Sequence, residues 1–165
     1  MRLSSVARPC LAGLALLVLS LPLRMEPAMA AEAEVPHPQL PSGAGKLDAE
    51  APKTFSTTPS GLKYRVLRKG AGAAPKATNR VKVNYHGWLD DGKVFDSSYK
   101  RGEPIEFGLN QVIPGWTEGM QLVGEGGMIE LLIPSQLGYG KSGTPGGPIP
   151  PNATLHFLVE LLGVR

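Results

Sequence analysis

Cysteine is almost absent from this sequence, since Cys10 is the single example among 165 residues. One thiol forms no internal disulfide, and it does not make a cysteine metal site, which needs several thiolates. Cys10 also lies in an N-terminal segment that we expect to be removed, so a thiol nucleophile is not expected in the remaining chain. We expect the fold to be stabilised by packing alone.

Histidine is scarce as well, and none of the three histidines lies near carboxylates or other histidines at metal-ligand spacing: His37, His86 and His156. We expect no metal and no cofactor. His86 could be combined with Asp96 and Ser97 into a hydrolase triad, but no nucleophile elbow surrounds that serine. A hydrolase is therefore a distant alternative, and the serine pair 97–98 suits hydrogen bonding in a turn better.

The chain has little net charge. It carries 17 basic and 14 acidic residues, a formal charge of +3. Four of these residues lie within 1–30, namely Arg2, Arg8, Arg24 and Glu26, so the remainder holds 14 basic and 13 acidic residues, about +1. This balance gives no reason to expect binding to nucleic acid.

No hydrophobic run is long enough to cross a membrane. The uncharged, leucine-rich run from Leu11 to Leu23 is shorter than the roughly 20 residues that a spanning helix needs. Arg2 and Arg8 precede it, and small residues follow at Ala28-Met29-Ala30. This order is typical of a secretory signal peptide, so we expect cleavage after Ala30 and export to the periplasm or an equivalent compartment.

An uncleaved amphipathic anchor is the alternative for this segment, because Arg24 and Glu26 make the cleavage region unusually charged. A lipid anchor is disfavoured, since Cys10 lies before the apolar run and outside any lipoprotein cleavage sequence. The sequence also contains no twin-arginine pair.

Residues 31–55 are rich in alanine, proline, glutamate and lysine and show no apolar periodicity. Four prolines block a regular helix there: Pro36, Pro38, Pro41 and Pro52. We predict a flexible linker over 31–55 and a folded domain over 56–165. The linker is also short for a helical dimerisation arm, so we expect a monomer.

Apolar residues that alternate with polar ones, or that form short continuous runs, predict strands over 62–67, 80–85, 128–133 and 154–162. Asp91-Gly92 predicts a hairpin leading into another strand near Phe95. A short helix is expected over 114–122, with Pro114 in its first turn and with Trp116 and Met120 on its buried face. Antiparallel strands with one short helix indicate an α+β domain.

Two short motifs are open to other interpretations. Gly138-Tyr-Gly-Lys-Ser-Gly143 matches a nucleotide-binding pattern, but the proline-rich segment after it forms no helix to present amides to a phosphate. Asn152-Ala-Thr154 is a glycosylation acceptor only if the host glycosylates exported proteins.

The stretch 94–116 carries most of the functional information. Large apolar residues recur in it beside Asp96, Arg101 and turn-forming glycines and prolines, which is too irregular for one long helix or strand. Any one of these apolar residues could simply fill the core. Together they predict a pocket for an uncharged ligand.

The order of these motifs closely resembles the signature of the FKBP-type peptidyl-prolyl cis-trans isomerases, from about Ser60 to the C-terminus. The resemblance is carried by Phe95-Asp-Ser-Ser98, Val112-Ile-x-Gly-Trp116-x-x-Gly119, Tyr139-Gly140 and Ile149-Pro-Pro-x-Ala-Thr-Leu-x-Phe157. It implies a curved antiparallel sheet around one short helix, and an enzyme that accelerates rotation about X-Pro bonds in other proteins. It also implies ligands of the rapamycin type.

The resemblance further implies roles for single residues. Trp116 would form the floor under the proline ring, and Asp96 would lie against the twisted amide, held by Tyr85 and Arg101. Tyr139 and the Ile113 N–H would donate hydrogen bonds to the ligand. The expected walls and remaining pocket residues are Tyr85, Phe95, Ile105, Phe107, Val112, Ile149 and Phe157.

Two positions depart from the family pattern. Ile105 stands where many members have an aromatic residue, and the loop over 143–149 is one residue longer, with Thr144 where histidine is common. Both departures concern the rim of the pocket and substrate preference. A holdase or protein-interaction module of the same fold, with little turnover, is the main alternative to an enzyme.

Overall fold

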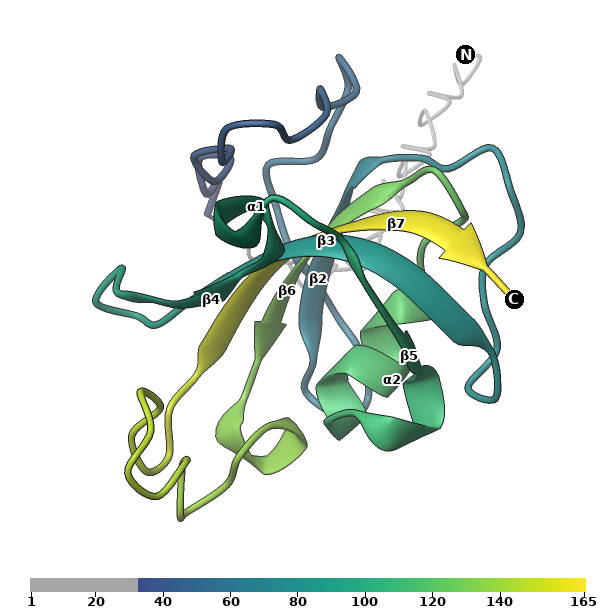
Figure 1. Cartoon of the computed structure of the whole chain (residues 1–165). Helices are drawn as coiled ribbons and strands as arrows, with labels where there is room; N and C mark the ends of the chain where they lie inside the picture. The colour runs from purple at the N-terminus through teal and green to yellow at the C-terminus, as the bar shows by residue number, and fades with distance from the viewer. Residues whose placement is uncertain (1–32) are drawn as a thin grey trace, which may run out of the picture. The chain divides into compact units, whose positions relative to one another are not determined.

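A computed structural model describes residues 33–165, and the predicted signal peptide lies outside them. Seven antiparallel strands form one sheet in the order β1-β2-β6-β7-β3-β4, and β5 also pairs with β3 (Figure 1). The strands are β1 (Ser56–Thr57), β2 (Lys63–Arg68), β3 (Arg80–Trp88), β4 (Val94–Ser97), β5 (Ile105–Gly108), β6 (Met128–Ile133) and β7 (Leu155–Val164). The predicted α+β class and the curved antiparallel sheet are confirmed.

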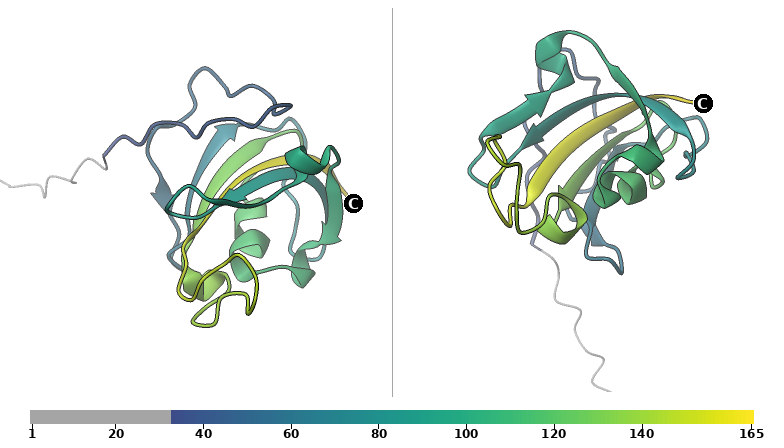
Figure 2. Two further views of the ribbon diagram at one scale, coloured as in Figure 1. Left: turned by 60° about the vertical axis from the view of Figure 1, so that its left-hand side comes forward. Right: turned by 60° about the horizontal axis from the view of Figure 1, so that its bottom comes forward.

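The helical elements are few and short. They are α1 (Ser98–Arg101), α2 (Pro114–Met120) and the 3-10 turns η1 (Leu109–Gln111) and η2 (Ser135–Leu137). The strands curve over α2, which packs against the sheet (Figure 2). The predicted helix over 114–122 therefore exists, begins at Pro114 as expected, and ends two residues earlier.

Helix α2 approaches β6 closely because of its two glycines. A Cβ atom on Gly115 would lie 2.5 Å from Ile133 Cγ2, and one on Gly119 would lie 2.7 Å from Leu131 Cδ1. Glycine lowers the intrinsic stability of a helix. Here it allows a contact distance that no other residue permits, and the buried Trp116 and Met120 side chains hold the helix in place.

Both faces of the sheet are covered, and alternate side chains of β7 point into the two buried layers. Leu155, Phe157, Val159 and Leu161 belong to the main core on the α2 side. Leu158 belongs instead to a smaller cluster with Leu67 and Met128 on the outer face. Successive side chains of a strand point to opposite faces, so one strand serves two buried layers.

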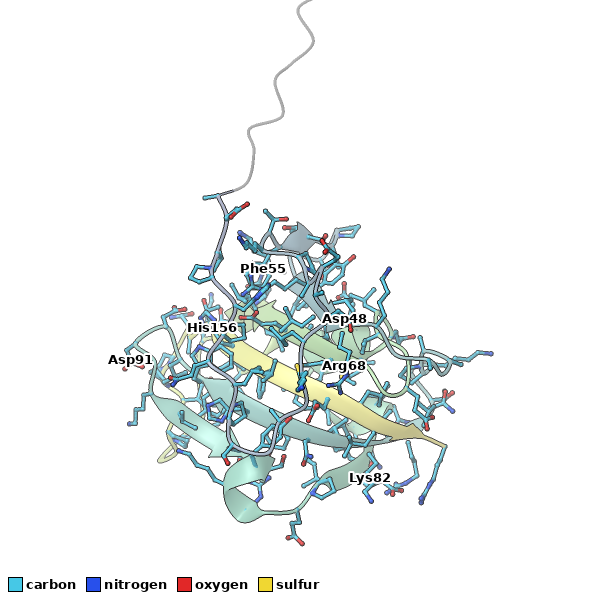
Figure 3. The ribbon with its side chains drawn as sticks, turned by 90° about the horizontal axis from the view of Figure 1, so that it is seen from above. Asp48, Phe55, Arg68, Lys82, Asp91 and His156 are labelled. Carbon is cyan, nitrogen blue, oxygen red and sulfur yellow. The ribbon has the colours of Figure 1, made fainter. Side chains whose placement is uncertain are left out.

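The segment 33–55 differs from the predicted flexible linker. It crosses the outer face of the sheet (Figure 3), and its Leu40, Leu47 and Ala51 pack against the smaller cluster. Backbone bonds add to this contact, since the Asp48 N–H donates to the Leu67 carbonyl at 2.9 Å. We call residues 33–55 the strap.

A buried arginine explains why a segment without regular structure is held. Arg65, 2% exposed, donates to the carbonyls of Val35 at 2.7 Å and Pro36 at 2.8 Å. Its Nε donates to Glu130 at 2.6 Å, and its guanidinium lies 4.5 Å from the centre of the Phe55 ring. Hydrophobic periodicity does not reveal such bonds, because they use the backbone of the strap.

Within residues 33–165, no helix is both long and apolar enough to cross a membrane. The same residues contain no group of three or more histidine, cysteine, aspartate or glutamate side chains placed to hold a metal ion.

Candidate functional site

A cavity of about 730 Å³ opens between α2, the inner face of the sheet and the loop before β7. All the predicted site residues line it except Arg101, which lies at its edge. The lining residues are Tyr85, Phe95, Asp96, Ile105, Phe107, Gln111, Val112, Ile113, Trp116, Tyr139, Thr144, Pro148, Ile149 and Phe157. The volume suits a small organic ligand, and most of these side chains are apolar.

Trp116 lies at the base of the cavity and is 5% exposed. Three aromatic rings contact it edge to face: Tyr85 at 5.5 Å, Phe107 at 5.4 Å and Phe157 at 5.2 Å between centroids. Such contacts fix the indole more firmly than burial alone. The position of Trp116 thus suits a rigid, apolar floor.

The aromatic wall depends on a residue that sequence reasoning missed. Phe95 and Phe157 meet edge to face at 5.4 Å beside Gly87 of β3. A Cβ on Gly87 would lie 2.7 Å from the Phe95 ring and 2.8 Å from the Phe157 ring. A glycine inside a strand often indicates that another group approaches closely, so the glycine at position 87 was the feature of the sequence that could have revealed this contact.

One edge of the cavity is polar. The Tyr85 hydroxyl and the Arg101 guanidinium both donate to the carboxylate of Asp96, and Arg101 Nη2 also donates to the Tyr85 oxygen at 2.8 Å. The Ser97 N–H donates to Asp96 at 2.8 Å. We call Tyr85, Asp96 and Arg101 the polar edge.

These bonds keep Asp96 charged. Burial alone raises the pKa of Asp96, but the hydrogen bonds from Tyr85 and Arg101 and the charge of Arg101 outweigh it, so this pKa lies below its ordinary value of 3.8. Burial and the neighbouring carboxylate raise the pKa of Tyr85 above 10.0. Neither group titrates near neutrality.

Two hydrogen-bond donors remain available to a ligand. Among residues 33–165, no acceptor bonds to the backbone N–H of Ile113 or to the hydroxyl of Tyr139. Tyr139 is 42% exposed, as expected for a side chain at the mouth of the cavity. A carbonyl of a bound peptide could accept from either donor.

The rim contains three further lining residues, Gln111, Thr144 and Pro148. Thr144 and Pro148 belong to the loop over 143–149 that was expected at the rim, whereas Gln111 was not predicted. The Thr144 hydroxyl accepts from the Ile149 N–H at 3.1 Å, and the Thr144 N–H donates to the Ile149 carbonyl at 2.9 Å. Thr144 therefore closes the loop that brings Pro148 and Ile149 to the cavity. The loop composition, rich in glycine and proline, gives no periodic signal for this closure.

The serine pair builds the turn after β4, as predicted. Ser97 caps α1 by accepting from the Lys100 N–H, and the Ser98 hydroxyl accepts from the Tyr85 N–H at 2.8 Å. His86 Nδ1 lies 3.0 Å from the Ser97 oxygen, but Asp96 faces the cavity and bonds to Tyr85 and Arg101 instead. The three residues do not form a hydrolase relay.

This arrangement suits a ligand with an apolar ring and a peptide carbonyl. It offers an aromatic floor, two hydrogen-bond donors and one charged carboxylate whose counter-ion is already in place. None of the lining residues described within 33–165 is an activated nucleophile. The arrangement suits preferential binding of one conformation of a bound group.

Comparison with known proteins gives matches over the same region. The peptidyl-prolyl isomerase FkpA of Escherichia coli is 56% identical over 113 residues, which cover 68% of this chain and 41% of FkpA. Its crystal structure superposes with a TM-score of 0.65 over 67% of this chain and 51% of that one. A peptidyl-prolyl isomerase structure from Pseudomonas syringae, 39% identical, gives a TM-score of 0.62 over 67% of this chain and 80% of that one.

A further relative is the outer membrane protein MIP of Legionella longbeachae, 48% identical over 65% of this chain and 46% of MIP. The chain thus spans less than half the length of these two curated relatives. The model of the FKBP-type peptidyl-prolyl cis-trans isomerase family matches residues 72–162, the part that contains the whole cavity. The chain belongs to the FKBP-type peptidyl-prolyl cis-trans isomerase family.

Proposed function

We propose that this protein is a peptidyl-prolyl cis-trans isomerase acting on proline-containing polypeptides. The observation that carries the proposal is the aromatic cavity itself: a Trp116 floor held by three rings, beside a carboxylate fixed at one edge. This cavity takes an uncharged ring and needs no cofactor for the reaction.

The chemistry follows from the nature of the X-Pro bond. Its barrier of roughly 18–20 kcal/mol arises from amide resonance, while the two isomers differ by only about 0.5–1 kcal/mol. Rotation removes the resonance and leaves the lone pair on the proline nitrogen, so the twisted amide is less polar than the planar one. A dry aromatic wall therefore binds the twisted form in preference, and the barrier falls.

Each predicted residue has a place in this scheme. The proline ring lies over Trp116, between the walls formed by Phe95 and Phe157. The Ile113 N–H and the Tyr139 hydroxyl bind carbonyls of the polypeptide on either side. The Asp96 carboxylate faces the carbonyl carbon of the twisted amide, which gains positive character when the nitrogen no longer donates electrons to it.

A coupled isomerisation assay on a short X-Pro peptide tests the proposal, run with and without rapamycin. We expect acceleration of exchange and its loss with the drug, because the pipecolyl ring of rapamycin would take the place of proline over Trp116. Full activity at saturating drug would contradict the assignment of the cavity. Tight peptide binding without turnover would favour the alternative of a holdase or interaction module.

We also propose export of a monomer, with residues 1–30 as a cleaved signal peptide. The order of charged, apolar and small residues supports this, and a relative carries the name outer membrane protein MIP. Mass spectrometry of the protein recovered from the producing cells should find Ala31 as the first residue, and an intact Met1 would contradict cleavage.

Sedimentation of the mature protein tests the oligomeric state, and we expect the mass of a monomer.

A further inference from the structure

The position of Arg101 in the polar edge depends on the short helix α1. Arg101 is the last residue of α1, which has four residues, and its side chain is 41% exposed. A side chain so exposed has few packing contacts to fix its position. The direction in which Arg101 meets Asp96 and Tyr85 therefore depends on how firmly α1 itself is placed.

Tyr99 anchors this turn on the side away from the cavity. Its hydroxyl donates to Glu160 Oε2 at 2.5 Å, and the Glu160 side chain is only 5% exposed. Glu160 belongs to β7 and, like Leu158, points to the outer face of the sheet. Tyr99 and Arg101 thus connect one turn to opposite faces of the sheet.

Glu160 also binds the strap. Its Oε1 accepts from the backbone N–H of Gly45 at 2.9 Å and from Arg68 Nη2 at 2.8 Å. Arg68 Nη1 donates in turn to the Lys46 carbonyl of the strap at 3.0 Å. One buried carboxylate therefore joins α1, β2, β7 and the strap, and α1 and the strap lie on the same side of the sheet in Figure 1.

We propose that Tyr99 is a positioning residue for the polar edge: through Glu160 it fixes α1, and α1 directs Arg101 onto Asp96. Gly45 extends this restraint to the strap, so the outer face of the sheet influences the cavity. The proposal rests on the isomerase function for its kinetic consequence. Its structural consequence, the placement of Arg101 against Asp96, is independent of turnover.

Tyr99→Phe removes only the hydroxyl and gives the sharpest test. We expect the titration of the Asp96 carboxyl, followed by carbon-detected NMR, to move toward its ordinary value, because Tyr85 would remain to stabilise the carboxylate while Arg101 would be less well placed. We expect kcat/KM to fall about threefold to tenfold, since small misplacements of a site cost this much or more. The matched control is Tyr64→Phe, where the lost hydroxyl bonds to no residue within 33–165, and both readouts should stay unchanged.

Gly45→Ala tests the connection to the strap. A Cβ at Gly45 would lie 2.6 Å from Glu160 Oε1 and even closer to Arg68 Nη1, so the strap or the ion pair must shift. We expect the Asp96 titration and kcat/KM to change in the same direction as in Tyr99→Phe. In a Gly45→Ala/Tyr99→Phe double variant, both changes should be smaller than the sum of the single effects, because both substitutions act through Glu160. Ser42→Ala, in an exposed part of the strap, is the control.

Two results would overturn the proposal. One is a lower melting temperature for Tyr99→Phe with an unchanged Asp96 titration and unchanged kcat/KM per folded molecule, which would make Tyr99 a stabilising contact only. The other is additive effects of the two substitutions, which would separate the strap from α1. If the wild-type chain turns over no X-Pro peptide, the proposed function fails, while the Asp96 titration still decides the positioning role.

Discussion

Trp116 is both part of the core and the base of the cavity. Its indole is nearly buried, yet one face lines an open volume, so packing and ligand binding act on the same side chain. The three rings around it belong to β3, β5 and β7, which lie far apart in the sequence. A change at this residue therefore affects stability and binding together.

Truncation to Trp116→Ala should lower the free energy of unfolding by about 3–5 kcal/mol, because a large aromatic side chain leaves a cavity. It should also abolish measurable binding of rapamycin. Trp116→Leu should retain part of both, since an aliphatic side chain refills some of the space. Urea denaturation and calorimetric titration measure the two effects, and an unchanged melting temperature and turnover in Trp116→Ala would remove the residue from its assigned place.

Asp96 allows a test of whether protons are transferred. Its folded pKa is lowered, so the carboxylate contributes to stability above the unfolded pKa, and this contribution is lost only as the pH falls through the acidic folded pKa. Tyr85 titrates above 10.0. We expect kcat/KM for an X-Pro peptide to be nearly flat from about pH 6 to 9, because neither group changes charge there.

The matched variant for this pH profile is Asp96→Asn, which keeps the shape of the side chain without its charge. Its rate should be lower than that of the wild type and equally flat. A bell-shaped wild-type profile that disappears in Asp96→Asn would make Asp96 an acid or base and would contradict the twisted-amide mechanism.

At the scale of elements, α2 is stabilised by its surroundings. Its two glycines weaken the helix by roughly 1 kcal/mol each relative to alanine, but they bring the backbone against β6. The cavity floor and the Ile113 N–H both depend on where this helix lies. Helix propensity and the geometry of the site are therefore opposed at Gly115 and Gly119.

Gly119→Ala should destabilise the domain by about 1–3 kcal/mol despite its better helix propensity, because the new methyl group meets Leu131. In a Leu131→Val background, the same substitution should cost clearly less, since the shorter side chain leaves room. Thermal unfolding of the four proteins completes the cycle. A stabilising Gly119→Ala would show that the close approach is unnecessary.

Sequence patterns located the longer elements, and the Asp91-Gly92 turn located the short strand β4, but the other short elements were missed. Strands β2, β3, β6 and β7 were found within a few residues, because alternation needs about six residues to be visible. Strand β5 and helix α1 have four residues each and carry no period. Their ends are set by tertiary bonds instead, such as the one from the Tyr85 N–H to Ser98.

The cavity residues could be named in advance only through the resemblance of the motifs. Residue patterns alone predicted an apolar pocket, and its lining agrees with that interpretation. Gly87 was missed because its role depends on rings that are distant in the sequence. Thr144 was expected at the rim, but its bonds to Ile149 were not, because they depend on how the loop closes. The catalytic roles assigned to Asp96, Tyr139 and Trp116 remain predictions until they are measured.

At the scale of the whole molecule, the strap makes the outer face of the sheet a second buried layer. Arg65 binds carbonyls at both ends of the strap, since it also donates to Lys53 at 3.2 Å. Burial raises the pKa of Glu130 even though Arg65 bonds to it, as expected for a carboxylate taken out of water. One planar guanidinium therefore fastens both ends of the strap, while Glu160 and Arg68 hold its middle.

Arg65→Lys should keep the charge but lose most of these bonds, because an ammonium cannot reproduce the fork of donors. We expect a loss of about 1–3 kcal/mol in the free energy of unfolding and faster trypsin cleavage after Lys46 and Lys53. The control is Arg80→Lys, whose side chain is 55% exposed and pairs with Glu106 at the surface. It should change stability by less than about 0.5 kcal/mol, and an equal effect of the two substitutions would contradict the special role of Arg65.

Strand β7 also determines where the chain tolerates changes in length. Phe157 faces the cavity and Leu158 faces the strap. Deleting one residue between Leu158 and Leu161 would turn every later side chain of the strand to the opposite face, so both buried layers would lose their packing at once. Deleting two residues would shorten the strand but preserve the parity of its faces. In a library of insertions and deletions, folded variants with changes in β7 should therefore carry even numbers of added or deleted residues more often than odd numbers. The rim loop over 143–149 should accept either.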